Sequence, residues 1–528
     1  MSGAVAAVSV LAACSGSAAS PGSAYPGHAT AAATLRAGIK PLPVAVTRVP
    51  AAADSIVADK APAALTAAFA RTLFASAPVV VVSGTAGQAL RVAGADARAD
   101  HAPVLLASTA TAAALAQLAA SARALHPVAV LTEGLPAAWP GELAARLPGV
   151  KVVGRAAALP ATRSPAPLSR VAVLVTAPGT APAKSIKSSK SITSSTSPAS
   201  IAAVTATAQA AGAAVVGVTG TDPRADPAAI TALARLRPAA VVAVGAQFGS
   251  AGRLASRIAV AETGRQLPGG GQVMFPGRRL VALYGHQGTP GLGVLGEQDL
   301  PASIARARQM AAAYRPLSRV PVVPAFEIIA SVAEASPGPD GSYSYETPVS
   351  QLLPWVREAT ADGLYVVLDL QPGRSGLLAQ AEYYQSLLKL PDVGLALDAE
   401  WKLQPGQKPL RQIGHVDIGE VNSVAGWLAA LTARHDLPQK LLVLHQFQLA
   451  MLTGERDLDT GHDDLAIVIH MDGQGTPGVK QGTWNAVTAA APRGVFFGWK
   501  DFLVKDHPML TPGQTMTKTP APVMISYQ

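Results

Sequence analysis

Two carboxylates separated by one residue end an apolar run in the C-terminal half of the chain. Residues 393–401 read VGLALDAEW, so Asp398 and Glu400 follow five residues that are typical of a buried strand. Because strand side chains alternate between two faces, we expect both carboxylates on one face, with Cα atoms about 6.5 Å apart. At that distance one charge raises the proton affinity of the other, which keeps a carboxylic acid able to donate a proton near neutral pH. The pair predicts acid–base catalysis by Asp398 and Glu400.

Other apolar runs in this half also end on polar residues. Asp369 and Asp472 end two of these runs, and we expect them to complete the catalytic site. The remaining polar strand ends are predicted to bind substrate: His286, Glu327, His445, Gln446, His470, Trp499 and Lys500.

The order of the elements indicates how these residues come together. Apolar runs recur from residue 279 to residue 501, and helix-like segments such as 302–314 and 420–435 separate most of them. Seven or eight strand–helix units over about 250 residues fit a (β/α) TIM-type barrel, which we place at residues 275–528. An open doubly wound sheet is the alternative. In a barrel, all carboxyl ends of the strands meet at one face, so the polar ends converge on one pocket.

Residues 393–401 resemble the Asp-x-Glu strand of barrel lysozymes and chitinase-like glycosidases. The resemblance implies that Glu400 is the acid and Asp398 its electrostatic partner, with Asp369 or Asp472 completing the site. Paired carboxylates are the groups that glycoside cleavage requires. The expected function is hydrolysis of a cell-wall or extracellular polysaccharide, and the alternative is a surface protein whose barrel binds wall polymer without turnover.

Metal-dependent hydrolysis is the other catalytic alternative. Its ligands would come from His286, His445, His470, Asp369 and Asp472. The sequence contains no His-x-His or His-Glu-x-x-His spacing, so we expect no metal and no other cofactor. It also lacks a Gly-x-Ser-x-Gly elbow and a dinucleotide-type glycine motif, which argues against a serine esterase and a nicotinamide enzyme.

The N-terminal half has a different pattern. Residues 45–265 alternate short Val- and Leu-rich runs with Ala-rich helical segments, which predicts a parallel, doubly wound, Rossmann-like α/β region. Residues 58–134, including APVLLAS at 102–108, resemble a cell wall-binding repeat of the second type. That resemblance implies non-covalent attachment to anionic wall polymers. A Ser-, Lys- and Pro-rich segment at 177–200 is predicted to be a surface loop.

The first residues indicate export. An apolar stretch at 4–10 leads into LAAC, which ends at Cys14 and resembles a bacterial lipobox, so residues 1–22 are predicted to be a lipoprotein signal and tether. Lipidation of Cys14 would anchor the protein to the membrane on the extracytoplasmic side. The net charge of +9 is scattered, which suits anionic polymers and argues against nucleic-acid binding. The oligomeric state stays open.

Overall fold

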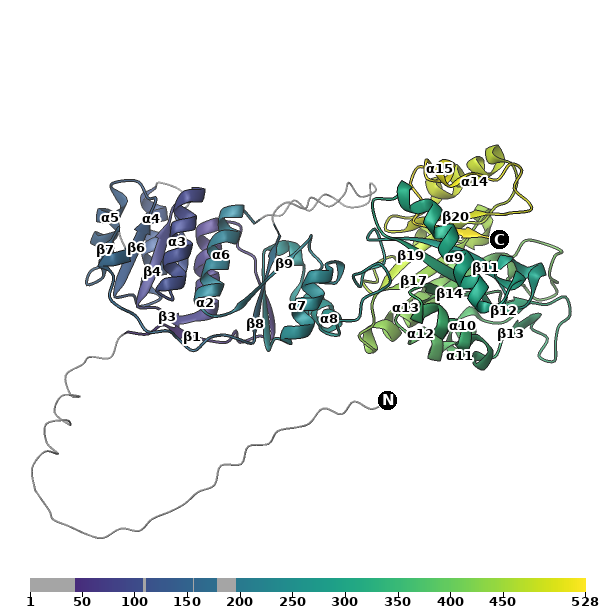
Figure 1. Ribbon diagram of the computed structural model, residues 1–528, viewed down its shortest axis with the longest axis horizontal. Helices are drawn as coiled ribbons and strands as arrows, with labels where there is room; N and C mark the ends of the chain where they lie inside the picture. The colour runs from purple at the N-terminus through teal and green to yellow at the C-terminus, as the bar shows by residue number, and fades with distance from the viewer. Residues whose placement is uncertain (1–42, 108–110, 155, 178–195) are drawn as a thin grey trace, which may run out of the picture. The chain divides into compact units, whose positions relative to one another are not determined.

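The computed structural model describes residues 43–107, 111–154, 156–177 and 196–528 (Figure 1). Cys14, the predicted signal and tether at 1–22, and residues 178–195 of the predicted loop lie outside the described residues. Residues 44–528 form one compact unit. Among the described helices, none has the length and apolar character needed to cross a membrane.

The N-terminal half contains two four-stranded parallel sheets. The strand order is β5-β4-β6-β7 in one sheet and β2-β10-β8-β9 in the other, and β1 pairs with β3 antiparallel. These strands are β1 (Val46–Thr47), β2 (Asp54–Val57), β3 (Phe74–Ser76), β4 (Val79–Ser83), β5 (Val104–Leu106), β6 (Ala129–Glu133), β7 (Lys151–Val153), β8 (Val171–Thr176), β9 (Ala214–Val218) and β10 (Ala240–Val244). The parallel sheets agree with the expected α/β class, while the Rossmann-like assignment stays a prediction.

In the part of this half that the structure describes, seven α-helices accompany these strands. They are α2 (Pro62–Leu73), α3 (Gly87–Ala99), α4 (Ala112–Arg123), α5 (Trp139–Arg146), α6 (Pro198–Ala210), α7 (Pro227–Leu236) and α8 (Ala251–Glu262). Local signals start several of them. In α7, Pro227 follows Asp226, whose carboxylate accepts backbone N–H groups of Ala228 and Ala229. An N-cap acceptor followed by proline is a favoured helix start.

The two sheets share parts of the chain. Strand β2 precedes β4 in sequence, yet it pairs with β10, with Ile56 opposite Ala243. Helix α6 follows β8 and contacts α2 and α3, which accompany the other sheet. One apolar cluster includes Val80 of β4 and Val242 of β10. The two sheets of this half are therefore built from interleaved parts of the chain, not from two consecutive segments.

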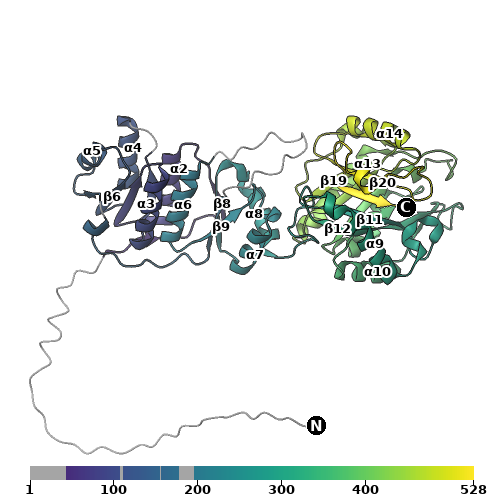
Figure 2. The same ribbon diagram turned by 45° about the horizontal axis from the view of Figure 1, so that its top comes forward.

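The C-terminal half is a closed barrel of eight parallel strands (Figure 2). Its strand order is β11-β21-β20-β19-β17-β15-β14-β12, and β11 also pairs with β12, which closes the barrel. The strands are β11 (Arg279–Gly285), β12 (Val322–Ala333), β14 (Tyr365–Leu370), β15 (Val393–Asp398), β17 (Lys440–His445), β19 (Leu465–Met471), β20 (Phe496–Asp501) and β21 (Met524–Tyr527). The TIM-type barrel prediction is confirmed.

Helices lie outside the barrel strands and connect most of them. They are α9 (Leu300–Tyr314), α10 (Val349–Ala361), α11 (Leu377–Tyr383), α12 (Gln385–Leu388), α13 (Ile418–Arg434), α14 (Pro477–Ala490) and α15 (Pro512–Thr515). Between β17 and β19 the structure has short 3₁₀ turns and β18 (Leu452–Thr453), which pairs with β16 (Val416–Asp417). Strand β13 (Ser344–Glu346) pairs antiparallel with the end of β12.

The barrel strands bury both faces. In β17, Leu441 and Val443 belong to the core inside the barrel, whereas Leu442 and Leu444 belong to the core between strands and helices. This alternation explains the continuous apolar runs in the sequence. Continued by one step, it turns the next residue, His445, into the barrel.

Candidate active site

Every barrel strand places one polar side chain inside the barrel, near the carboxyl end in seven strands and midway along the longer strand β12. We call these eight residues the polar ring. None is more than 3 % exposed: Tyr284, Glu327, Asp369, Asp398, His445, His470, Lys500 and Ser526. Several contact partners on strands that are not neighbours, as expected for side chains that meet in the barrel interior. The strand ends therefore converge as predicted, but they form a buried ring and none of the eight residues lines the pocket described below.

His445 is the centre of the polar ring. Its Nε2 lies 3.0 Å from Glu327 Oε1, and its Nδ1 lies 2.9 Å from Oδ2 of Asp472, the residue that follows β19. Burial works to lower the pKa of His445, but the charge of Glu327 and the bond to Asp472 outweigh it and raise the pKa well above its usual range. Without another ligand, His445 is an imidazolium that donates to both carboxylates.

The carboxyl groups of the polar ring and of the adjacent Asp472 divide into two kinds. Burial works to raise the pKa of Glu327 and of Asp472, but contact with His445 outweighs it and holds both below their usual range. Burial raises the pKa of Asp369 to about 6, and Tyr284 Oη donates to its Oδ2 at 2.8 Å. Burial, with the charges of Glu400 and Asp369, raises the pKa of Asp398 well above its usual range. The ring thus holds carboxylates and a protonated carboxylic acid side by side.

Glu400 does not share a strand face with Asp398, which corrects the sequence expectation. Strand β15 ends at Asp398, and Ala399–Trp401 form a 3₁₀ turn, η7. The backbone turns here around Gly414, whose N–H donates to Glu400 O at 2.7 Å. A Cβ at Gly414 would lie 2.5 Å from that oxygen, so only glycine fits. Glu400 consequently lies outside the barrel interior, in the turn that follows the carboxyl end of β15.

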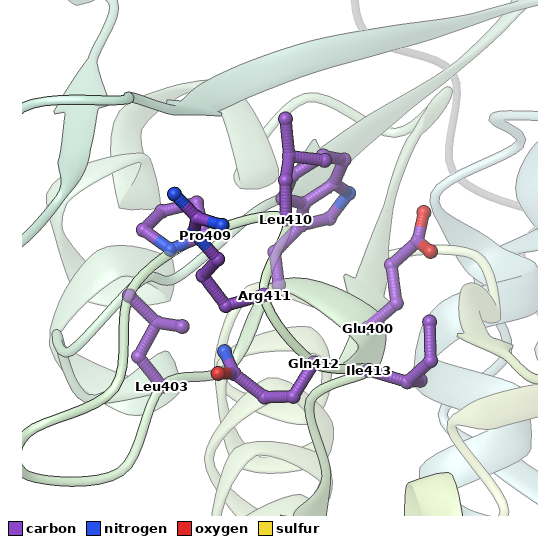
Figure 3. A pocket seen from close by; sticks show the side chains of 8 residues that line it. Glu400, Leu403, Pro409, Leu410, Arg411, Gln412 and Ile413 are labelled. Carbon is purple, nitrogen blue, oxygen red and sulfur yellow. The ribbon is translucent and has the colours of Figure 1, made fainter.

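Glu400 lines a surface pocket of about 310 Å³ (Figure 3). Burial and then the charge of Asp472 raise the pKa of Glu400 to about 7. The rest of the lining comes from the loop after η7: Trp401, Leu403, Pro409, Leu410, Arg411, Gln412 and Ile413. Sequence reasoning did not find this loop, because its only signal is a Pro- and Gly-containing composition without periodicity. The predicted acid therefore lies beside an indole, a guanidinium and an amide.

Two predicted substrate-binding residues point away from the polar ring. Trp499 is fully buried on the helix side of β20, where its ring packs against Trp484 and its Nε1 donates to Asp501. The alternation of β20 explains this, because Lys500 takes the inward position. Gln446 follows the inward His445 and donates to Glu455 Oε2 at 2.9 Å, outside the ring. Both assignments to the substrate site are corrected.

The other predicted residues lie in the ring or at its edge. Lys500 Nζ lies 3.4 Å from the centre of the Tyr284 ring. His286 lies in the loop after β11, half-buried, with Nδ1 3.0 Å from Thr289 Oγ1 and Nε2 3.2 Å from Thr347 Oγ1. It therefore supports a loop beside the ring instead of joining it.

Ser526 and Gly498 are site residues that sequence reasoning missed. His470 Nε2 lies 2.7 Å from Ser526 Oγ. A Cβ at Gly498 would lie 2.0 Å from His470 Nδ1, so the glycine makes room for the imidazole. Burial lowers the pKa of His470 to about 3, which keeps the imidazole of His470 neutral. The alternating segment Met524–Tyr527 carried a strand signal, but it is only four residues long.

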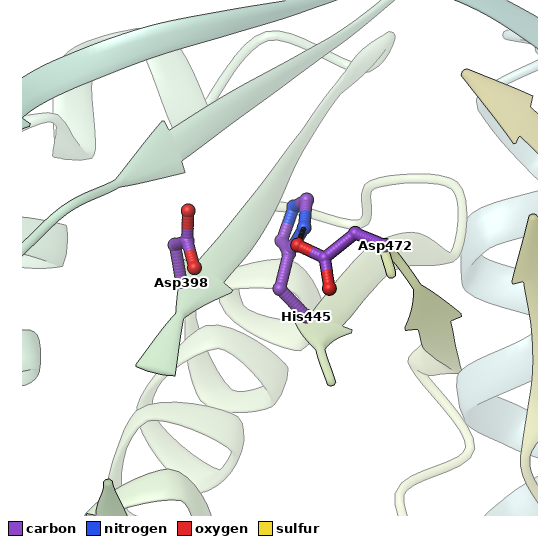
Figure 4. Close-up of side chains that lie close together, drawn as sticks. All are labelled: Asp398, His445 and Asp472. Carbon is purple, nitrogen blue, oxygen red and sulfur yellow. Dashed lines mark hydrogen bonds and ion pairs between the residues drawn. The ribbon is translucent and has the colours of Figure 1, made fainter. Parts of the chain in front are cut away.

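Three residues of this region have donor atoms close enough to hold a metal ion: Asp398, His445 and Asp472 (Figure 4). His445 lies between the two carboxylates in this view. Of the five residues that the sequence offered as metal ligands, His445 and Asp472 belong to this group.

Comparison of the chain with protein-family models, with curated proteins and with solved structures finds no match. The fold and the site geometry therefore carry the functional argument.

Proposed function

We propose that the barrel is a glycoside hydrolase that acts on a cell-wall or extracellular polysaccharide. The single observation that carries the proposal is the position of Glu400, which lines the pocket while its pKa is raised to about 7. A carboxylic acid with that pKa can both hold and release a proton near neutral pH. The pocket also offers Trp401 as a surface for the apolar face of a sugar ring, and Arg411 and Gln412 as hydrogen-bond donors.

In the proposed reaction Glu400 donates its proton to the glycosidic oxygen as the bond between that oxygen and the anomeric carbon breaks. Water supplies the hydroxyl group that ends on the anomeric carbon, and its remaining proton restores Glu400. The transition state carries positive charge on the sugar. The carboxylate of Asp472, whose pKa is held low and whose charge acts on Glu400, supplies negative potential at the pocket. Asp398 and Asp369 are not among the residues that line the pocket.

The test uses the purified full chain with peptidoglycan and with chitin-type oligomers, and it measures new reducing ends. Glu400→Gln is expected to lower the rate by at least about 100-fold, as removal of a general acid does. Glu358→Gln, an exposed position on α10, is the matched control and should keep full activity. Equal activity of the wild type and Glu400→Gln, or no activity in either, would remove the hydrolase proposal.

A second candidate is a surface protein that binds wall polymer without cleaving it. The observation in its favour is the burial of the polar ring, since Glu327, Asp369, His445 and His470 have no exposed surface. A ring of this kind can serve as a polar core that holds the barrel together. Full-length protein that is retained on purified walls, and that releases no reducing ends, would support this candidate over the first.

The cellular location is part of the same proposal. We expect lipidation at Cys14 to hold the protein at the membrane on the extracytoplasmic side, with the N-terminal half in contact with anionic wall polymer. Cys14→Ser should move the protein from the membrane fraction to the soluble fraction in a bacterial expression host. If the wild-type chain is also soluble, or carries no lipid by mass spectrometry, the anchor does not exist.

A further inference from the structure

The polar ring and the adjacent Asp472 contain buried carboxyl oxygens that no donor in the described part of the chain pairs with. Four of these oxygens have no hydrogen-bond partner among the described residues: Glu327 Oε2, Asp369 Oδ1, Asp398 Oδ1 and Asp472 Oδ1. Leaving a buried acceptor unpaired costs about 1–3 kcal/mol, and more for a charged group. Four unpaired oxygens in one cluster indicate that a positive species belongs there.

The distances between the donor atoms indicate that this positive species is a metal ion. Donor atoms of Asp398, His445 and Asp472 all lie within 4.8 Å of one another. His445 Nδ1 and Asp472 Oδ2 are 2.9 Å apart. Two ligand atoms that bind one ion at about 2.1 Å and at about a right angle are separated by about 3.0 Å. The observed pair therefore already has the spacing of two adjacent ligands.

The far side of His445 supports the same conclusion independently. Metal-bound histidines almost always give their second ring N–H to a carboxylate or carbonyl, which fixes the tautomer and the ring orientation. Here Glu327 Oε1 lies 3.0 Å from His445 Nε2, on the side opposite Asp472. Glu327 is fully buried, so the contact is not an exposed surface pair.

We propose that Asp398, His445 and Asp472 bind one divalent transition-metal cation, with Glu327 orienting His445. Two carboxylates and one imidazole suit Zn²⁺ or Mn²⁺. On binding, the ion takes the place of the proton on His445 Nδ1 and of the proton held by Asp398, and both protons leave to solvent. Asp472, which is 6 % exposed, is the most accessible of the three ligands.

The inference does not rest on the proposed hydrolase activity, and its test needs no substrate. Chelator-treated full-length protein is dialysed against Zn²⁺ or Mn²⁺ alone, and the retained metal is measured by mass spectrometry. The wild type is expected to retain one equivalent of at least one ion. Asp398→Asn and Asp472→Asn should each weaken binding by more than tenfold, and Glu327→Gln by about 10–100-fold. Glu455→Gln, a buried carboxylate outside the ring, should bind as the wild type does.

A spectroscopic measurement covers the case in which a variant fails to fold. Pulsed electron paramagnetic resonance of Mn²⁺ bound to the wild type should show coupling to one imidazole nitrogen. Absence of that coupling when Mn²⁺ is bound, equal binding by the wild type and both Asn variants, or no retention of either ion would each overturn the proposal. A wild type that binds the ion but cleaves no polysaccharide would refute the hydrolase proposal alone.

Discussion

His445 Nε2 lies 3.0 Å from Glu327 Oε1 across the interior of the barrel. Their strands, β17 and β12, are not neighbours, because β14 and β15 separate them in the sheet. Both side chains are fully buried, so this pair joins two parts of the barrel without help from solvent. Losing one partner of such a pair leaves an uncompensated buried charge, which costs about 3–5 kcal/mol.

Removing the charge of Glu327 should destabilise the barrel. For Glu327→Gln in the presence of a chelator, we expect the free energy of unfolding to fall by roughly 3 kcal/mol. The melting temperature of the barrel transition should then fall by roughly 6–12 °C in calorimetry. Glu358→Gln, on the exposed face of α10, should change stability by less than about 0.5 kcal/mol. An unchanged melting temperature for Glu327→Gln would contradict the assigned ion pair.

Asp369 should make the barrel less stable as the pH rises. Its folded pKa of about 6 is above the usual value of 3.8, so between these two values the folded state binds more protons than the unfolded state. Its contribution to stability is therefore fully present below about pH 4 and is lost as the pH rises through 6. Asp369→Asn should make the decline between pH 4 and 6 shallower, as followed by denaturant unfolding of chelator-treated protein. A slope identical to that of the wild type would refute the assignment.

Gly498 should not tolerate a side chain. The added Cβ in Gly498→Ala would push against His470 Nδ1 and disturb the contact between His470 and Ser526. We expect a loss of about 1–3 kcal/mol, as for other overpacked cores. Gly482→Ala is the matched control, because this exposed α14 glycine has open space around it and should gain about 0.5–1 kcal/mol. If the described packing is correct, thermal unfolding should show a lower melting temperature for Gly498→Ala and a higher one for Gly482→Ala.

Trp401 and Trp499 should respond differently to replacement by alanine. Trp401→Ala should leave the melting temperature unchanged and weaken the binding of an oligosaccharide roughly tenfold, since a buried aromatic face contributes about 1.5 kcal/mol. Trp499→Ala should cost about 3–5 kcal/mol of stability, because it removes a packed core side chain. Calorimetry and oligosaccharide titration of both variants provide the comparison, and a Trp401 variant with unchanged affinity would exclude the pocket as the sugar site.

The barrel was predictable because short apolar runs alternate with helical segments along the sequence. The polar ring was predictable because most of these runs end on a polar residue. The apolar runs of this half begin at residue 279, and the first barrel strand, β11, also begins there. Sequence reasoning did not settle which side each end residue takes, so Trp499 and Gln446 were assigned inward together with their neighbours. It also placed Glu400 on the strand, because the turn at Ala399 depends on Gly414, a partner in the following loop.

The remaining differences have a similar cause. The pairing of β2 with β10 depends on a partner more than 180 residues away, and no local pattern encodes that choice. Strand β21 was missed because four residues give too short a periodic signal. In each case the deciding contact is distant in sequence.

The position of β21 has a consequence for how the barrel assembles. This strand lies between β20 and β11, and Leu280 is aligned with Met524, so the first and last barrel strands in chain order are direct partners. Pairing β11 with β21 closes a loop that contains the other six barrel strands. Pairings between residues so distant in sequence slow folding. Until β21 pairs with its two neighbours, Ser526 cannot reach His470, so this contact forms only when the barrel closes.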